Sequence, residues 1–110
     1  MIKKQIGDRR GEGTTLNNIG QVYQAKGDYS AALKQYERSL AIMQEIGARA
    51  EEAGGSWNIG WIYKKQDNLA RAEPYLSRAV KLAEQLERPE LEDWREILED
   101  VRTKLHEQRN

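Results

Sequence analysis

The side chains best able to take part in chemistry here are amides, indoles and lysines, and catalytic or metal-binding groups are sparse. His106 is the only histidine and the chain has no cysteine, so no second imidazole or thiolate can complete a metal site with it. The acidic neighbours Glu51 and Glu52 have the pattern of a solvated helix face, as do Asp93 and Glu96. No glycine-rich phosphate loop follows a strand, because no segment has a strand pattern. We therefore predict no enzyme activity, no cofactor and no metal.

The candidate binding residues lie on two similar segments forty residues apart. NNIGQVY occupies residues 17–23 and WNIGWIY occupies residues 57–63. Away from the shared apolar positions, the first copy is polar and rich in amides, whereas the second is aromatic and basic. This surface suits an extended peptide with a polar backbone, one or two apolar side chains and an acidic end. The predicted peptide- or partner-binding residues, on the same face as Thr14, are Asn17, Asn18, Gln21, Gln24, Trp57, Asn58, Trp61, Lys64 and Lys65.

Two features of this set allow more than one interpretation. Asn18 and Asn58 are repeated, and an amide can donate to and accept from a bound peptide, but it can equally bond a neighbouring helix. Trp57 and Trp61 are one helical turn apart. They are either exposed anchors for a ligand or partly covered by a C-terminal helix through Trp94, and partial cover is the favoured interpretation.

Helical hairpins must position these residues. Apolar residues at steps of three and four predict a first helix from about Gly13 to Lys26 and a second from Tyr29 to Ile46. Between them, Gly27 suits a left-handed helix end and Asp28 an N-cap. The pattern predicts an antiparallel hairpin.

A second hairpin follows, with Asp67-Asn68 in its turn. Asp and Asn tolerate the left-handed conformation, and Asn68 can act as an N-cap, so these residues can take the roles of Gly27 and Asp28. Pro74 lies about six residues into its second helix, where it predicts a bend or a late helix start. Gly54-Gly55 lies in the opening of its first helix. Close packing or fraying would explain this pair, and a hinge between the hairpins is the alternative.

The chain ends in a segment where the repeat is lost. The residues that step by three and four there form a narrow apolar seam: Leu91, Trp94, Leu98, Val101 and Leu105. We predict a capping helix over residues 89–108 that covers the second hairpin, since terminal repeats need such cover. A homodimer seam centred on Trp94 and Leu98 is the alternative.

The repeated residues resemble the tetratricopeptide repeat. Ile19-Gly20-x-x-Tyr23 with Ala32-x-x-x-Tyr36, and Ile59-Gly60-x-x-Tyr63 with Ala72-x-x-x-Leu76, are similar to the family pattern L-G-x-x-Y…A-x-x-x-F. The forty-residue period is similar to the extended subclass of kinesin light chains and of many bacterial and archaeal arrays. The family's Trp corresponds to Leu16 and Ser56. The resemblance implies that Asn at positions 18 and 58 bonds the main chain of a peptide.

The predicted fold is an all-α superhelix, a tetratricopeptide-like solenoid of two helical hairpins and a capping helix in one domain, residues 1–110. Ile6-Gly7-x-Arg9-x-x-Glu12 matches residues 46–52, so residues 1–12 are read as the end of a preceding partial repeat. Repeat 1 then covers residues 13–48 and repeat 2 residues 53–88. The sequence is accordingly interpreted as an excerpt of a longer array or as an array whose first unit needs cover.

Charge limits the class of partner. The charges of eighteen basic and eighteen acidic residues cancel, which argues against nucleic acid as the main partner. The sequence has no long apolar run, so we predict no membrane partner. Residues 1–26 contain five basic and two acidic side chains, whereas residues 89–110 contain four basic and seven acidic ones. This difference in charge between the two ends is either chance or a sign of head-to-tail assembly. We predict a cytoplasmic module that binds a peptide or protein on the concave face. The alternative is a structural segment whose exposed hairpin ends form homo-oligomers or stack with further repeats.

Overall fold

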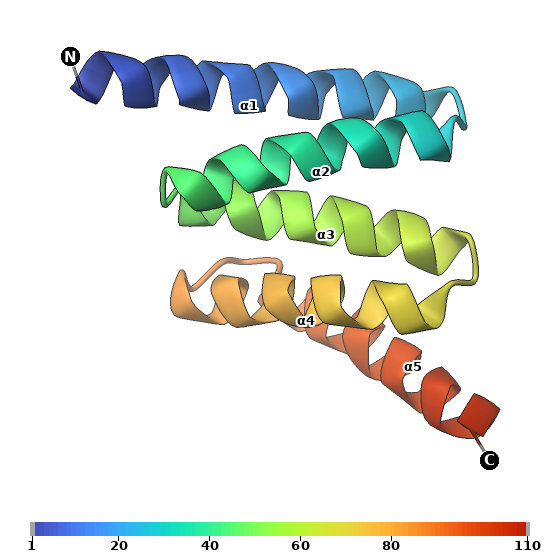
Figure 1. The fold of residues 1–110 in the computed structure, drawn as a ribbon. Coiled ribbons are helices and arrows are strands. Elements are labelled where there is room, and N and C mark those ends of the chain that lie inside the picture. The colour runs from blue at the N-terminus through green and yellow to red at the C-terminus, as the bar shows by residue number, and fades with distance from the viewer. Residues whose placement is uncertain (1, 110) are drawn as a thin grey trace.

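The computed structural model describes residues 2–109, with side chains described from Gly7 onward, so Met1, Asn110 and the side chain of Ile6 lie outside the described residues. Within this range the chain forms five helices and no strand: α1 (Ile2–Ala25), α2 (Tyr29–Glu45), α3 (Arg49–Lys65), α4 (Leu69–Gln85) and α5 (Leu91–Arg109). Consecutive helices α1 to α4 lie side by side and antiparallel, and α5 packs on α4 and diverges from it (Figure 1). The all-α prediction is confirmed.

The turns recur every twenty residues and use one geometry. Backbone φ is positive at Gly27 (80°), Gly47 (70°), Asp67 (59°) and Glu87 (53°). After each of them, the next amide donates to the carbonyl five residues earlier, as in Asp28 to Tyr23 at 2.9 Å, which closes a Schellman turn. The predicted left-handed residues at 27 and 67 are confirmed.

Both predicted N-caps are present. The Oδ1 atom of Asp28 accepts from the amide of Ala31 at 3.2 Å, and that of Asn68 accepts from the amide of Arg71 at 3.2 Å. Each cap satisfies an amide in the first turn that has no partner within its helix. The helix starts at Tyr29 and Leu69 follow from these caps.

Close contact within each hairpin depends on the repeated glycines. A Cβ atom at Gly20 would lie 2.7 Å from the ring of Tyr36, and one at Gly60 would lie 2.6 Å from Leu76 Cδ2. Ala32 is fully buried, as is its counterpart Ala72. These small residues let the paired helices approach, as the motif predicted.

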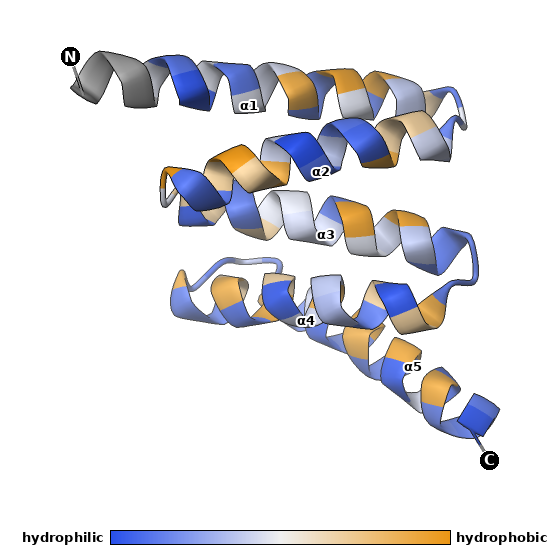
Figure 2. Ribbon diagram, viewed as in Figure 1, coloured by the Kyte–Doolittle hydropathy of each residue, from blue (hydrophilic) through white to orange (hydrophobic). Residues whose placement is uncertain are grey.

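The hairpins join in one core that runs from α2 to α5. Figure 2 shows hydrophobic and hydrophilic residues alternating along the helices, which is the pattern of helices that bury one stripe. On α5 the seam residues Trp94, Leu98 and Val101 are buried, and α5 lies against α4. The capping-helix prediction is confirmed, and the seam is occupied within the chain rather than available for a dimer.

Two predicted details differ from the structure. The helix expected from about Gly13 begins at Ile2, so α1 runs through Gly7, the counterpart of the left-handed Gly47. The turn at Gly47 is closed by the amide of Ala48, which donates to Met43 at the end of α2, whereas the residues before Gly7 are themselves part of α1. A late start caused by Pro74 is also wrong. α4 begins at Leu69 and contains Pro74, which offers no amide to the carbonyl of Ala70.

Candidate functional site

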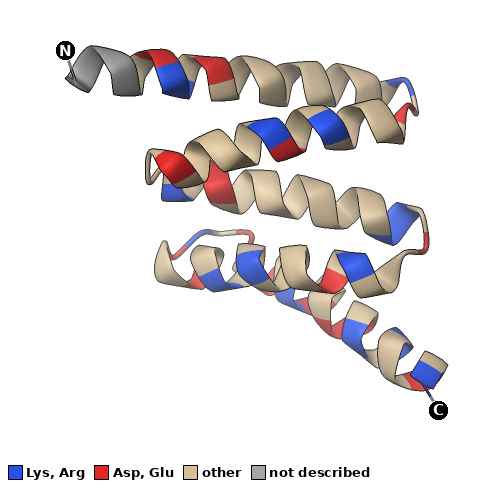
Figure 3. Cartoon of the chain, in the orientation of Figure 1, with Lys and Arg blue, Asp and Glu red and all other residues tan. Residues whose placement is uncertain are grey.

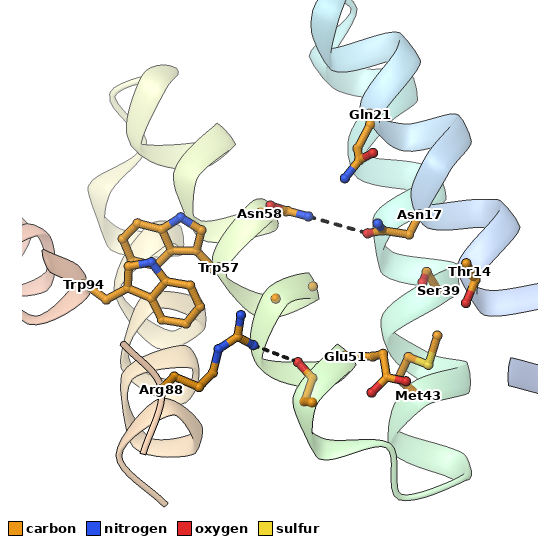
Figure 4. A pocket seen from close by; sticks show the side chains of 13 residues that line it. Thr14, Asn17, Gln21, Ser39, Met43, Glu51, Trp57, Asn58, Arg88 and Trp94 are labelled. Atoms are coloured by element: carbon orange, nitrogen blue, oxygen red, sulfur yellow. Dashed lines mark hydrogen bonds between the residues drawn. The ribbon is translucent and has the colours of Figure 1, made fainter. Parts of the chain in front are cut away.

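A groove of about 370 Å³ lies between α1 and α3, and α2 forms its floor. Figure 4 shows the amides of Asn17 and Gln21 on α1 facing Asn58 on α3, with Ser39 and Met43 beneath them. Trp57, Arg88 and Trp94 close it on the side of α5. We call this the α1–α3 groove, and its lining residues are Thr14, Asn17, Gln21, Ser39, Met43, Ala50, Glu51, Gly54, Gly55, Trp57, Asn58, Arg88 and Trp94.

Gly54 and Gly55 keep part of this groove open. A Cβ atom at Gly54 would meet no atom within 4 Å, and one at Gly55 would be in ordinary contact with Leu40 Cδ1 at 3.6 Å. The pair lies within α3, which begins at Arg49, and neither glycine is required by close packing, so that explanation is wrong, while fraying stays a prediction. A side chain at Gly54 would project into the groove. The hinge remains a prediction.

The amide pair that meets across the groove is not the repeated one. Nδ2 of Asn58 donates to Oδ1 of Asn17 at 3.5 Å, a long hydrogen bond between α3 and α1 (Figure 4). Asn18 is exposed and does not line the groove. The reason is geometric: Asn58 faces the preceding hairpin, and the same face of α1 carries Asn18 to the outside of the array. A helix-bonding role is thus observed for Asn58 alone.

A shallower depression of about 390 Å³ continues the groove along α1 and α3. It is lined by Gln21, Gln24, Ala25, Tyr29, Tyr36, Asn58 and Trp61. The hydroxyl of Tyr36 donates to Oε1 of Gln24 at 2.6 Å, and burial raises the pKa of Tyr36, which keeps this phenol a donor. Gln24 lines the depression, and this bond leaves its amide NH2 group unused.

The two indoles have different neighbours. Trp57 and Trp94 stack with ring centroids 4.6 Å apart and planes 5° apart, so α5 covers one face of Trp57 as predicted. Trp61 is not covered by Trp94. Instead, the ammonium group of Lys65 lies 5.4 Å from its ring centroid, which is a cation–π contact.

Arg88 anchors the turn before α5 at the groove wall. Its Nη1 donates to the carbonyl of Ala50 at 3.0 Å, and its Nε and Nη2 donate to the Glu90 carboxylate at 3.1 and 3.3 Å. The guanidinium also lies 5.2 Å from the ring centroid of Trp94. Hydrogen bonding from Arg88 holds the pKa of Glu90 below its ordinary value, so this pair stays charged at neutral pH. Arg88 thus ties α3 to the turn that carries Trp94.

Charge is absent from the two segments that face each other across the groove. Neither residues 13–25 nor residues 53–63 contain a charged side chain, and Figure 3 shows these stretches of α1 and α3 in tan. At one end of the groove Arg10 pairs with Glu51. At the other end lie Lys64 and Lys65 in the last turn of α3. The facing segments are therefore uncharged, and the two charged residues that line the groove are both paired, Glu51 with Arg10 and Arg88 with Glu90.

Six of the nine predicted binding residues line the groove or its continuation: Asn17, Gln21, Gln24, Trp57, Asn58 and Trp61. Asn18, Lys64 and Lys65 line neither. The sequence reasoning missed the floor residues Ser39 and Met43, since it considered only the helices expected to form the concave face. The sequence reasoning also missed Arg88. This residue directly follows Glu87, which has a positive φ, so the recurrence of turns every twenty residues could have indicated its position.

Two searches of the described part of the chain concern metal clusters and membrane-spanning helices. Among residues whose positions are described, no three acidic or histidine side chains come together in a way that could hold a metal ion. His106 is exposed on the last turns of α5. None of the described helices combines the length and apolar character needed to cross a membrane.

Comparison with known proteins identifies the repeat. A family model described as tetratricopeptide repeat matches residues 2–45 and, in a second alignment, residues 11–85. The matched residues span α1 to α4 and leave out α5. No curated protein matches the chain. Since the family model matches more than half of the residues, in helices paired through the motif glycines, the chain belongs to the tetratricopeptide repeat family.

Proposed function

We propose that the chain binds an extended, uncharged segment of a protein partner in the α1–α3 groove. Repeats of this family generally mediate protein–protein interaction and are typically not enzymes. The observation that carries the proposal is the groove itself. The segments of α1 and α3 that face each other across it carry no charge, Gly54 opens it, and it is lined by amides on one side and an indole on the other.

The lining favours a particular kind of segment. Asn17, Gln21 and Asn58 offer donors and acceptors for the main chain of a peptide. An apolar side chain of moderate size has room over Gly54, between Met43 and Trp57. Lys64 and Lys65 lie beyond Trp61, outside the groove, and favour an acidic residue in the partner next to the uncharged segment. A cytoplasmic location is part of the same proposal.

A blocked groove provides the test. Gly54→Leu places a side chain in open space of the groove, and because Leu is a better helix former than Gly it should leave the fold intact. Gly11→Leu is the matched control: Gly11 also lies within a helix with no atom within 4 Å of its Cβ position, but it does not line the groove.

Twelve-residue peptides selected from a random library against the wild-type chain, labelled with fluorescein, are the probes. We expect Gly54→Leu to weaken their binding at least about tenfold in fluorescence anisotropy, an energy of about 1.4 kcal/mol. Gly11→Leu should bind as the wild type does, and Trp61→Ala or Asn58→Ala should weaken binding severalfold. Equal binding by Gly54→Leu, or no selected peptide, would contradict the proposal.

A further inference from the structure

A second hollow, of about 430 Å³, lies between the first turns of α4 and the last turns of α5, where α5 diverges from α4 (Figure 1). It has no lining residue in common with the α1–α3 groove or with the depression that continues that groove. We call it the α4–α5 hollow. Its lining residues are Ala70, Glu73 and Pro74 of α4 with Arg102, Leu105, His106 and Arg109 of α5.

The α4–α5 junction is polar where the equivalent α2–α3 junction is apolar. Leu33 and Tyr63 pack against the core, and the hydroxyl of Tyr63 reaches Glu37 of α2. Forty residues later the corresponding positions hold Glu73 and Thr103. The lining of the α4–α5 hollow is therefore suited to a polar ligand rather than to an apolar side chain.

The α5 side of the hollow carries basic groups on one helix face. Arg102, His106 and Arg109 are spaced four and three apart, which places them on the same face of α5. Basic groups near the end of a helix interact favourably with its dipole, but this holds on any face. Lys104, for example, pairs with Asp100 at 3.1 Å and does not line the hollow. The dipole thus accounts for basic residues in these turns but not for their shared face.

Arg102 is held in place by three hydrogen bonds. Its Nε donates to Oε2 of Glu73 at 2.9 Å and its Nη2 to the hydroxyl of Ser77 at 3.2 Å, both on α4. Its Nη1 donates to Glu99 at 3.3 Å. A guanidinium has five N–H groups, so two remain for a ligand. The pair with Glu73 fixes Arg102 across the junction before any ligand arrives.

The α4 side of the hollow carries hydrogen-bond acceptors. Pro74 lies inside α4 and has no amide hydrogen, so the carbonyl of Ala70 has no donor four residues later in its own helix. Arg102 bonds one oxygen of Glu73, and the other can accept a further bond. The hollow therefore offers donors and positive charge from α5, and acceptors from α4.

We propose that the α4–α5 hollow binds inorganic phosphate. The phosphate oxygens accept from Arg109, from His106 and from the remaining N–H groups of Arg102, as charge-assisted hydrogen bonds. At neutral pH every inorganic phosphate ion also carries at least one hydroxyl group, which donates to the carbonyl of Ala70 or to Glu73. Sulfate has the same tetrahedral shape but no hydroxyl, so it would leave these acceptors without a donor. The hollow thus selects phosphate over sulfate.

The single histidine gives a direct readout. His106 is the only histidine of the chain, so its ring proton Hε1 is identified in a proton NMR spectrum without further assignment. The full chain is titrated with sodium phosphate or sodium sulfate at fixed neutral pH and constant ionic strength. We expect a saturable shift with phosphate, with a dissociation constant of about 1 mM, and at least about fivefold weaker binding of sulfate. O-phosphoserine, mainly a dianion without a phosphorus hydroxyl, should bind as sulfate does.

Two matched variants test the assignment of the residues. Arg109→Gln and Lys104→Gln each remove one positive charge from the last turns of α5, but only Arg109 lines the hollow. We expect Arg109→Gln to weaken phosphate binding at least about fivefold and Lys104→Gln to change it less than about twofold. Pro74→Ala supplies an amide to the carbonyl of Ala70, and it should reduce the preference for phosphate while leaving sulfate binding unchanged.

Three results would overturn the proposal. The first is the absence of a saturable shift with phosphate. The second is equal binding of phosphate and sulfate, or equal losses from Arg109→Gln and Lys104→Gln, because the basic face would then attract anions without selecting among them. The third is tighter binding of O-phosphoserine than of phosphate, since the ligand would then be a phosphorylated side chain.

Discussion

The two hairpins contain the same packing motif but use it in different surroundings. In both, a glycine admits a large side chain of the partner helix, Tyr36 at Gly20 and Leu76 at Gly60. α3, however, is held between α2 and α4, whereas α1 contacts mainly α2. The comparison teaches that a repeated residue fixes local geometry, while its place in the array sets how much it contributes to stability.

The largest expected difference concerns the two motif glycines. A Cβ atom at Gly60 would lie 2.6 Å from Leu76 Cδ2 and 3.1 Å from the Leu76 backbone nitrogen, and α3 has no free side toward which it can move. We expect Gly60→Ala to cost about 3 kcal/mol or more. Gly20→Ala clashes only with the Tyr36 ring, and α1 can shift outward, so about 1–2 kcal/mol is expected.

Urea unfolding followed by circular dichroism measures both variants. Gly11→Ala is the control, since its Cβ position is open and Ala is the better helix former. Equal losses for Gly20→Ala and Gly60→Ala would show that the position of a hairpin in the array does not affect the cost.

The second difference concerns Glu52 and Glu12, and the prediction of a solvated face is wrong for Glu52, which is 5% exposed. Glu52→Ala removes two hydrogen bonds from a buried carboxylate that links α2, α3 and α4, and about 1.5–3 kcal/mol should be lost. Glu12→Ala removes an exposed pair with Arg9 and should leave the unfolding midpoint close to that of the wild type. Thermal melts at low and high salt check both. A large loss from Glu12→Ala would mean that the exposed pair contributes more than surface pairs usually do.

The sequence was sufficient to predict the paired helices because local chemistry determines them. Asp28 and Asn68 cap the second helix of each hairpin, and Gly27 takes the left-handed conformation that the turn requires. Gly60 allows the paired helices to pack closely, as a glycine would in any hairpin of this kind. Their roles depend on residues within the same hairpin. The repeat pattern therefore predicted the helix order and the capping helix.

The features that were mispredicted depend on more distant contacts. The start of α1 could not be found from its own residues. Gly7 repeats Gly47, but the turn at Gly47 forms because the end of α2 precedes it and closes it. The sequence named no helix partner for Asn58, and the partner is Asn17, because the relation between hairpins brings together residues that differ by one position in the repeat. The groove floor at Met43 required knowing how α2 lies beneath α1 and α3.

The smallest expected effect compares the two turns that follow α2 and α4. Glu87 holds φ at 53° where Gly47 holds 70°, and a side chain with a Cβ atom is strained in this left-handed region. We expect Glu87→Gly to stabilise the chain by about 0.5–1 kcal/mol, and Gly47→Ala to destabilise it by about 1 kcal/mol. Differential scanning calorimetry at matched pH measures both shifts. A lower melting temperature for Glu87→Gly would contradict this expectation. It would mean that glycine adds more freedom to the unfolded chain than it relieves strain in the folded one. Positions 47 and 87 would then share a turn geometry without sharing a preference for glycine.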